Sequence, residues 1–234
     1  MQALTCEQVR RVDEIAIRDY QMPGIVLMEN AGRGAAEIIH SLCPDATALV
    51  LCGRGNNGGD GYVIARHLQI LGHEVSILAV CAVDELSGDA KVNAVIADAA
   101  GIEIEVIEEK ANQEGTSLAM KLGKTNCIID GLLGTGAKPP LRGIYAALVS
   151  AANESDAMRI ALDIPTGLDG DTGEVIGEAF RADHTMTFVA PKVGFQQKNA
   201  DEFVGVVHVV GIGVPTKLIR ELDLPNNELG LPKN

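Results

Sequence analysis

Three aspartates could supply acid–base chemistry or oxygen ligands, because each stands in a stretch rich in small residues. Asp60 lies in CGRGNNGGDGY, Asp130 in IIDGLLGTG and Asp163 in ALDIPTGLDG. Glycine lets a backbone come close to a ligand, and a carboxyl group in a closed pocket can both donate and accept a proton. Each aspartate alone would as readily cap a helix or close a turn. Three such stretches in one chain favour a functional site.

The first stretch matches the spacing G-x-G-x-x-G over residues 53–58, which is typical of turns that bind a dinucleotide phosphate. A single match is a weak signal, and two asparagines followed by a carboxylate stand where the phosphate would lie. The Asn57 amide, the Asp130 carboxylate and the Thr166 hydroxyl are hard oxygen donors of low total charge. They suit a monovalent cation or loosely held Mg²⁺ better than zinc, which would favour Cys or His.

Two further groups have both a functional and a structural interpretation. Lys138 and Arg142 follow Gly-Thr-Gly just before a predicted helix, where they form an anion site or are ordinary surface charges. Glu29 and Asn30 in IVLMENAG are either the polar face of a helix or a lid over the site, and we favour the lid.

The hydrophobic pattern alternates between strands and helices, which predicts an α/β protein with an open, mostly parallel sheet covered on both faces. In such a sheet the ligand binds beyond the carboxyl ends of the strands, where all three aspartates would meet. A possible capping box joins Thr5 and Gln8. The strands are predicted within residues 46–53, 74–80, 102–107, 126–136, 158–170, 184–191 and 205–215, and the later helices within 25–42, 62–72, 89–101, 112–124, 143–153 and 216–222.

Size and composition predict one aliphatic-cored domain. The chain has 234 residues with three Tyr, four Phe and no Trp. Its net charge of −13 argues against nucleic acid and against an anionic membrane surface as partners. Five widely spaced cysteines without a C-x-x-C pair predict reduced thiols. With no apolar stretch of membrane-spanning length and no signal core, we expect a cytoplasmic protein. Residues 1–45 should form N-terminal helices, and residues 225–234 a mobile tail.

Five segments occur in an order that resembles a known family. MENAG, GRGNNGGDGYVIARHL, IIDGLLGTG, ALDIPTGLDGDTG and FVAPKVG together are similar to the YjeF N-terminal domain of the NAD(P)H-hydrate epimerases. The resemblance covers nearly the whole chain and implies a single domain over residues 1–234, with a Rossmann-like three-layer α/β/α sandwich. It implies epimerisation of the R and S forms of hydrated NADH and NADPH (NADHX and NADPHX) at nicotinamide carbon 6, in nicotinamide nucleotide repair. It also implies one K⁺ per subunit, a homodimer, and a companion ATP- or ADP-dependent dehydratase.

The resemblance assigns roles residue by residue. The K⁺ ligands would be Asn57, Asp130 and Thr166, although the family often has Ser at the last position. Lys192 in FVAPKVG matches a motif position without an assigned role. The substrate-binding residues would be Asn56, Asn57, Gly58, Gly59, Asp60, Gly134, Thr135, Gly136, Ala137, Lys138, Pro139, Pro140 and Asp163.

The implied reaction needs a group that protonates a leaving oxygen or removes a proton, and then reverses its role. Carbon 6 is bonded to both a hydroxyl and the ring nitrogen, so losing hydroxide or opening the ring would erase its configuration. Asp163 is the first candidate catalytic residue, with Asp60 or Asp130 assisting.

Three alternatives remain open. One is a YjeF-type module that binds a nucleotide or protein without catalysis, but its loops would be expected to be eroded. Another is an NAD-dependent oxidoreductase, but Asp84 and Glu85 lie further from the glycine loop than the roughly 20 residues typical of a ribose-binding acid. The third is the epimerase half of a bifunctional enzyme.

Overall fold

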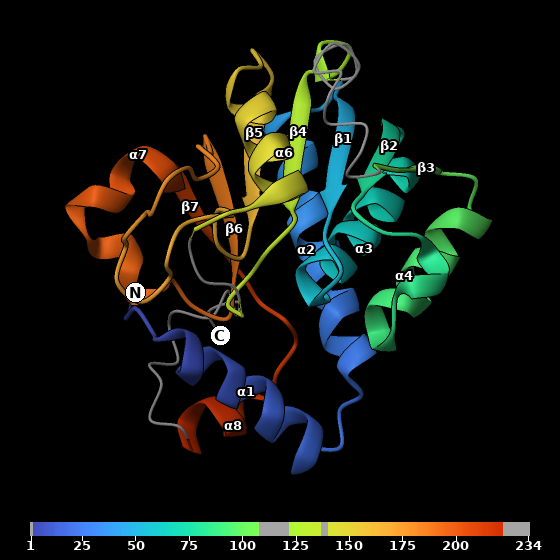
Figure 1. Cartoon of the computed structure of the whole chain (residues 1–234). Helices are drawn as coiled ribbons and strands as arrows, with labels where there is room; N and C mark the ends of the chain where they lie inside the picture. The colour runs from blue at the N-terminus through green and yellow to red at the C-terminus, as the bar shows by residue number, and fades with distance from the viewer. Residues whose placement is uncertain (1, 108–121, 137–139, 222–234) are drawn as a thin grey trace.

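The computed structural model describes residues 2–107, 122–136 and 140–221. A parallel sheet of seven strands forms its centre, in the order β3-β2-β1-β4-β5-β6-β7 (Figure 1). Every strand lies within a range predicted from the sequence, and the parallel α/β prediction is confirmed. The strands are β1 (Thr47–Cys52), β2 (Glu74–Ala79), β3 (Glu103–Val106), β4 (Cys127–Gly131), β5 (Met158–Leu162), β6 (His184–Phe188) and β7 (Val206–Val210).

The strand order reverses at β1. From β1 the chain builds β2 and β3 on one side, and then returns to place β4 through β7 on the other. The pairing register sets Cys52, at the end of β1, opposite Ala79 of β2 and Gly131 of β4. Neighbouring strands end together, so their carboxyl ends form one edge of the sheet. The reversal of strand order leaves a crevice at this edge, between β1 and β4.

Helices cover both faces of the sheet because the side chains of buried strands alternate between faces. In β1, Val50 and Cys52 belong to the core shared with α2 (Gly24–Leu42), α3 (Asn56–Ile70) and α4 (Gly88–Ala99). Leu51 belongs to the opposite core, shared with α6 (Gly143–Asn153). Both cores are mainly aliphatic, which confirms the three-layer α/β/α prediction.

One helix lies outside the three layers. Helix α1 (Cys6–Arg18) crosses below the carboxyl ends of the strands and packs against α2 and the short α8 (Thr216–Glu221) (Figure 1). It begins with the predicted capping box, in which Gln8 N donates to Thr5 Oγ1 over 3.1 Å and Thr5 N donates to Gln8 Oε1 over 2.8 Å. The remaining elements are α7 (Asp201–Val204) and the 3-10 turns η1 (Val83–Glu85), η3 (Val193–Gln196) and η4 (Lys198–Ala200).

Some sequence predictions were wrong or fall outside the described residues. Helix α3 begins at Asn56 rather than at Tyr62. Most of the predicted helix within 112–124, all of the tail 225–234 and residues 137–139 lie outside the described part of the chain. Among the described helices, none has the length and apolar character to cross a membrane.

Candidate active site

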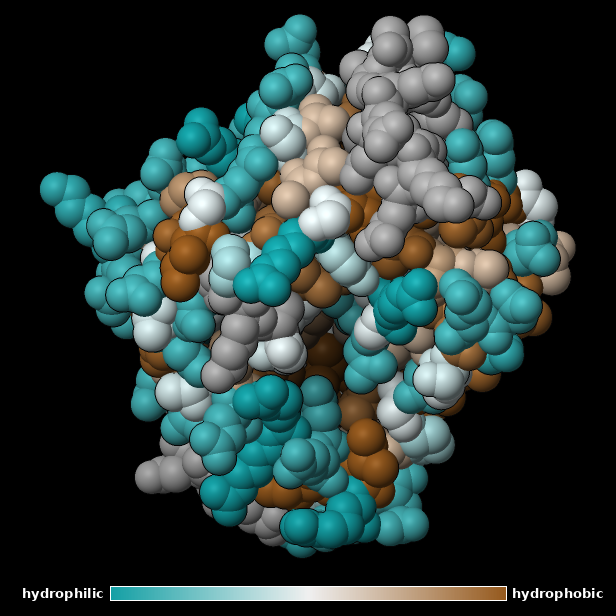
Figure 2. All heavy atoms as spheres, viewed as in Figure 1, coloured by the Kyte–Doolittle hydropathy of each residue, from teal (hydrophilic) through white to brown (hydrophobic). Residues whose placement is uncertain are grey.

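A cavity of about 550 Å³ lies between the carboxyl ends of the strands and α1. Figure 2 shows this face hollowed, with apolar side chains visible inside the hollow. The walls come from α1, α2, the start of α3, and the segments that follow β4, β5, β6 and β7. This is where the reversed strand order places a ligand site, and the volume lies within the range of about 300–1,000 Å³ typical for small molecules.

The glycine-rich stretch forms the first turns of α3 instead of a loop. A Cβ on Gly58 would lie 2.1 Å from the carbonyl oxygen of Gly53, and one on Gly59 would lie 2.6 Å from Met28 Cε. Glycine is a poor helix former, so helix propensity predicted the wrong start. The close approach to the strand end and to α2 needs glycine here, and it carries Asp60 into the cavity on a helix.

Asn57 has an unusual hydrogen-bonding position. Its side-chain nitrogen donates to the carbonyl oxygen of Leu133 over 2.9 Å. Its side-chain oxygen is buried and has no hydrogen-bond partner among the described residues. A buried acceptor left unpaired costs about 1–3 kcal/mol. An oxygen-coordinated cation would satisfy this Asn57 atom.

Asp130 and Thr166 lie beside the same segment. The fully buried Asp130 carboxylate accepts hydrogen bonds from Thr166 N and Thr166 Oγ1, both over 2.8 Å, and from Leu132 N over 3.1 Å. Thr166 Oγ1 in turn accepts from Leu133 N over 3.1 Å. Burial raises the pKa of Asp130 to about 6, against the opposing effect of these hydrogen bonds. Asn57 and Thr166 therefore both bind the Leu133 backbone, and Asp130 is joined to them through Thr166. Asp130 itself does not line the cavity.

The second glycine-rich turn forms part of the cavity wall. Gly134, Thr135 and Gly136 all line it, and a Cβ on Gly134 would lie 3.3 Å from Asn57 Cβ. Pro140 is exposed and does not line the cavity, and neither does the exposed Arg142, which precedes α6. Ala137, Lys138 and Pro139 lie outside the described residues, so the predicted anion site is described only in part.

Asp163 stands at the centre of a strained turn. Its φ is 62°, and Ile164 N donates to the carbonyl oxygen of Leu162 over 2.7 Å, which makes a three-residue γ-turn. Val189, after the neighbouring strand β6, has a φ of 68° in a similar turn. Positive φ at a non-glycine residue costs about 1–3 kcal/mol and occurs mainly at functional sites. Asp163 and Val189 both line the cavity.

Lys192 connects the two turns. It is fully buried, and its Nζ donates to Asp163 Oδ1 over 2.5 Å and to Thr187 Oγ1 over 2.8 Å. It also reaches the carbonyl oxygens of Phe188 and Ala190, at 3.1 and 3.3 Å, on either side of Val189. The ammonium charge offsets the Asp163 carboxylate and holds its orientation. The residue without a role in the sequence motif is thus the main partner of Asp163.

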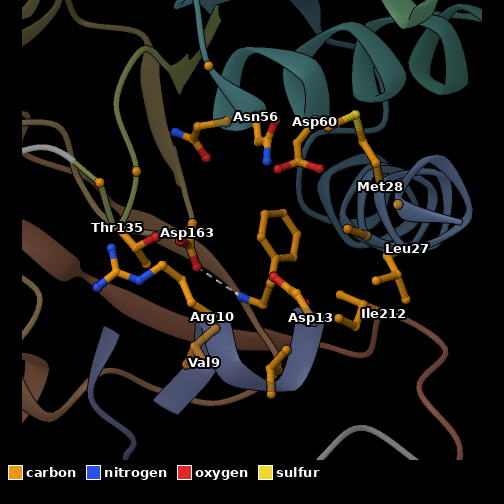
Figure 3. A pocket seen from close by; sticks show the side chains of 18 of the residues that line it. Val9, Arg10, Asp13, Leu27, Met28, Asn56, Asp60, Thr135, Asp163 and Ile212 are labelled. Carbon is orange, nitrogen blue, oxygen red and sulfur yellow. Dashed lines mark hydrogen bonds between the residues drawn. The ribbon is translucent and has the colours of Figure 1, made fainter. Parts of the chain in front are cut away.

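Asp60 lies in an apolar setting. It is 9 % exposed, and the structure gives its carboxyl group no hydrogen bond to any described residue. Burial raises the pKa of Asp60 well above its usual value, and the charges of Asp163 and Asp13 raise it further. In Figure 3 its carboxyl group points into the cavity from α3. These effects favour the protonated form of Asp60, which can act as a proton donor.

The wall formed by α1 was missed by the sequence analysis. Val9, Asp13 and Ile17 line the cavity from successive turns of this helix, together with Arg10. Burial, and then the charge of Asp163, raise the pKa of Asp13 to about 6. The sequence did carry a signal, because the i, i+4, i+8 spacing sets Asp13 between two apolar residues on one helical face.

The predicted lid at Glu29 and Asn30 is instead part of a packed helix. Both residues lie within α2, where Glu29 accepts hydrogen bonds from Arg66 and pairs with His67 Nε2 over 2.8 Å. Asn30 donates to the carbonyl oxygen of Ile212 over 3.1 Å. These contacts fix α2 against its neighbours, so the helix-face interpretation is the correct one.

Comparison with known proteins matches this architecture and these segments to one family. The model of the family described as "YjeF-related protein N-terminus" matches residues 24–194. The chain belongs to this family. The match includes every residue proposed from the sequence for the site, whereas α1 lies before it.

Similar proteins extend the likeness over nearly the whole chain. A protein of Rhodopirellula baltica named NAD(P)H-hydrate epimerase is 58 % identical over 94 % of this chain and 88 % of its own length. A protein of Thermofilum pendens named bifunctional NAD(P)H-hydrate repair enzyme Nnr is 38 % identical, and its match covers 99 % of this chain but 44 % of the relative. The crystal structure of the yeast protein ynu0 (YNL200c) superposes with a TM-score of 0.81 at 20 % identity, over 100 % of this chain and 97 % of that one. That structure supports the fold.

Proposed function

We propose that this protein is an NAD(P)H-hydrate epimerase, an isomerase that interconverts the R and S forms of NADHX and NADPHX in nicotinamide nucleotide repair. The observation that carries the proposal is the 58 % identity to a protein of that name over 94 % of the chain. The cavity agrees with it, because carboxyl groups with raised pKa values face a space of suitable size.

Asp60 and Asp163 divide the chemistry in this proposal. Asp60 donates its proton to the hydroxyl oxygen on carbon 6, so that the carbon–oxygen bond breaks and water leaves. The lone pair of the ring nitrogen then forms a double bond to carbon 6, which becomes planar. The Asp163 carboxylate, held by Lys192, stabilises the positive ring. Water then adds to the other face of carbon 6 and releases a proton, which replaces the one that Asp60 gave. Asp130 takes no part in the proposed step, because it lies outside the cavity lining.

Substrate binding falls to the two glycine-rich segments and Asp163. The start of α3 offers Asn56, Asn57 and backbone N–H groups, which attract an anionic group through the helix dipole. The segment 134–140 would hold the dinucleotide, and among its described residues Gly134, Thr135 and Gly136 line the cavity.

A single K⁺ per subunit would be held by Asn57, Asp130 and Thr166. The unpaired Asn57 oxygen, the buried carboxylate and the hydroxyl are hard ligands with little total charge, which fit K⁺. When bound, the ion would supply positive charge close to the substrate phosphates. Asn57 and Thr166 hold the segment after β4 against α3 and the segment after β5 through their contacts with Leu133. Asp130, in β4, accepts a hydrogen bond from Thr166.

The functional partner in this proposal is an ATP- or ADP-dependent NAD(P)H-hydrate dehydratase, which would consume the S form. Relatives named bifunctional NAD(P)H-hydrate repair enzyme support the pairing of an epimerase with a second repair activity. The five free cysteines fit the cytoplasmic location expected from the sequence. The homodimer remains a prediction, which sedimentation of the purified protein would test.

The test is an epimerase assay on separated R-NADPHX. Purified protein is mixed with the R form alone, and the S form is followed by chromatography in KCl and in NaCl of equal concentration. We expect rapid interconversion that is faster in KCl. Interconversion at the spontaneous rate by folded protein would contradict the proposed function and favour a binding module that lacks catalysis.

A further inference from the structure

We propose that Asp13 of α1 is a second catalytic residue, which acts on the face of the nicotinamide ring opposite Asp60. The inference rests on the proposed epimerase function and deepens it. Figure 3 shows the two carboxyl groups entering one cavity from different walls, Asp60 from α3 and Asp13 from α1. Asp163 lies on a third side, from the end of β5.

Asp13 is placed for chemistry rather than for structural support. It lines the cavity, it is half-buried, and the structure gives its carboxyl group no hydrogen bond to any described residue. Asp19, the C-cap of the same helix, is instead paired with Arg18, at 2.6 Å. A half-buried carboxyl group without a protein partner, set between Val9 and Ile17 on the helical face that lines the cavity, points to a polar ligand on that side.

The three carboxyl groups interact with one another. The charge of Asp163 raises the pKa of both Asp13 and Asp60, and the charge of Asp13 raises that of Asp60. The charges of neighbouring carboxyl groups thus favour the protonated forms of Asp13 and Asp60. The Lys192 charge opposes this effect at Asp13.

Epimerisation needs proton transfer on both faces of the planar ring. When water has left carbon 6 with the Asp60 proton, a water molecule adds from the other side. Asp13 takes a proton from that water, and the electrons of the carbon–nitrogen double bond return to nitrogen. Asp13 then gives this proton up to water in the cavity, and Asp60 takes up a proton from water, so that the proton balance closes over one turnover. The reverse reaction uses the same groups with donor and acceptor exchanged.

Backbone contacts hold Asp13 in register with the other two groups. Just before α1, Leu4 N donates to the carbonyl oxygen of Pro191 over 2.8 Å, and Val193 N donates to Leu4 O over 3.0 Å. The segment before α1 therefore pairs with the backbone around Lys192. The same short segment positions the Asp163 side chain and the helix that carries Asp13.

The first experiment compares Asp13→Asn with Glu14→Gln, which removes the neighbouring, exposed carboxyl group of the same helix. Loss of a general acid–base group lowers the rate about 10²–10⁴-fold, so kcat/KM for R-NADPHX should fall at least about 10²-fold in Asp13→Asn. Glu14→Gln should retain wild-type kcat/KM. Formate should partly restore Asp13→Ala by entering the vacated space, and it should not accelerate Glu14→Gln.

A second experiment separates the two ring faces. The equilibrium between the epimers is fixed, so a variant loses kcat/KM equally in both directions. The rate at which each epimer exchanges its carbon 6 hydroxyl with water that carries a heavy oxygen isotope is not fixed in this way, so a variant can lose exchange for one epimer alone. Asp13→Asn should still exchange one epimer through Asp60 and fail to exchange the other, whereas Asp60→Asn should show the opposite preference.

Three outcomes would overturn parts of this reasoning. Wild-type kcat/KM in Asp13→Asn would exclude Asp13 from catalysis. The proposed epimerase function would still stand in that case, provided that the wild-type protein is active. Equal loss of exchange for both epimers, without rescue by formate, would make Asp13 a structural residue. An inactive wild-type protein would remove the proposed function itself.

Discussion

Replacing Lys192 by Met tests the view that this buried ammonium organises the site. The substitution keeps the side-chain length and leaves the Asp163 carboxylate and the carbonyls of Phe188 and Ala190 without their shared donor. Removing one member of a buried ion pair costs about 3–5 kcal/mol. Asp163 is 14 % exposed and still accepts from Phe188 N over 3.4 Å, so we expect the lower end, about 3 kcal/mol.

The assay is thermal unfolding beside steady-state kinetics. For a domain of this size about 3 kcal/mol lowers Tm by about 6–12 °C. A misplaced Asp163 should lower kcat about 10²-fold with a smaller change in KM. Lys198→Met, which removes an exposed ammonium nearby, should change neither value.

A double variant supplies the decisive comparison. If the cost in Lys192→Met comes from an unpaired carboxylate, then adding Asp163→Asn should restore part of the lost stability. Wild-type Tm in Lys192→Met, or a double variant that is less stable than Lys192→Met alone, would refute the assignment. Either result would mean that the neighbouring backbone holds the turns at Asp163 and Val189 in place without the Lys192 ammonium.

The other predictions concern pH, cation binding and helix packing. The pKa of Asp13 rises from 3.8 in the unfolded chain to about 6 in the folded protein, so its ionisation destabilises the fold as pH rises through that interval. In chemical denaturation the stability of Asp13→Asn should match that of the wild type below pH 3.8 and exceed it above about pH 6 by at most ~3 kcal/mol. Solvent screening reduces this gap, as do the charged groups near Asp13, which are Asp60, Asp163 and Arg10 on the cavity wall and Lys192 behind Asp163. Equal stability of the two proteins above pH 6 would contradict this. Replacing NaCl with KCl should stabilise the wild type by up to about 2.7 kcal/mol when K⁺ is in hundredfold excess over its Kd, and so raise its Tm. The Tm of Asn57→Ala should not rise in KCl. Gly58→Ala should destabilise the protein, because its Cβ would meet the Gly53 carbonyl oxygen at 2.1 Å, whereas Gly55→Ala, with open space around its Cβ, should have little effect on Tm.

Most of the sheet could be predicted from the sequence because buried parallel strands are continuous apolar runs. The run before Gly53 and the run before Gly131 both end where hydrophobic residues give way to small ones, and the strands end there too. The start of α3 could not be predicted in this way. Helix propensity weighs glycine by its conformational freedom, whereas Gly58 is required here by the close Gly53 carbonyl at the strand end, and Gly59 by Met28 of α2.

The site was predicted in part for a similar reason. The stretches around Asp60, Asp130 and Asp163 indicate that each aspartate lies close to a strand end. Only the structure shows that Asp60 and Asp163 line the cavity and that Asp130 does not. The positive φ of Asp163 and Val189 leaves no trace in residue type, since neither is glycine. The partnership of Lys192 with Asp163 spans 29 positions and depends on strands that lie side by side.

The pairing of Leu4 with the backbone at Pro191 and Val193 has a consequence for synthesis on the ribosome. Leu4 can make these two hydrogen bonds only after β6 and the segment that follows it have been synthesised. Closing so long a loop is slow compared with forming the local helices and strands. A nascent chain can therefore build β1 to β5 and their helices well before it holds Asp13, Asp60 and Asp163 together. Activity should thus appear only after residue 193 has left the exit tunnel, as a late and all-or-none event.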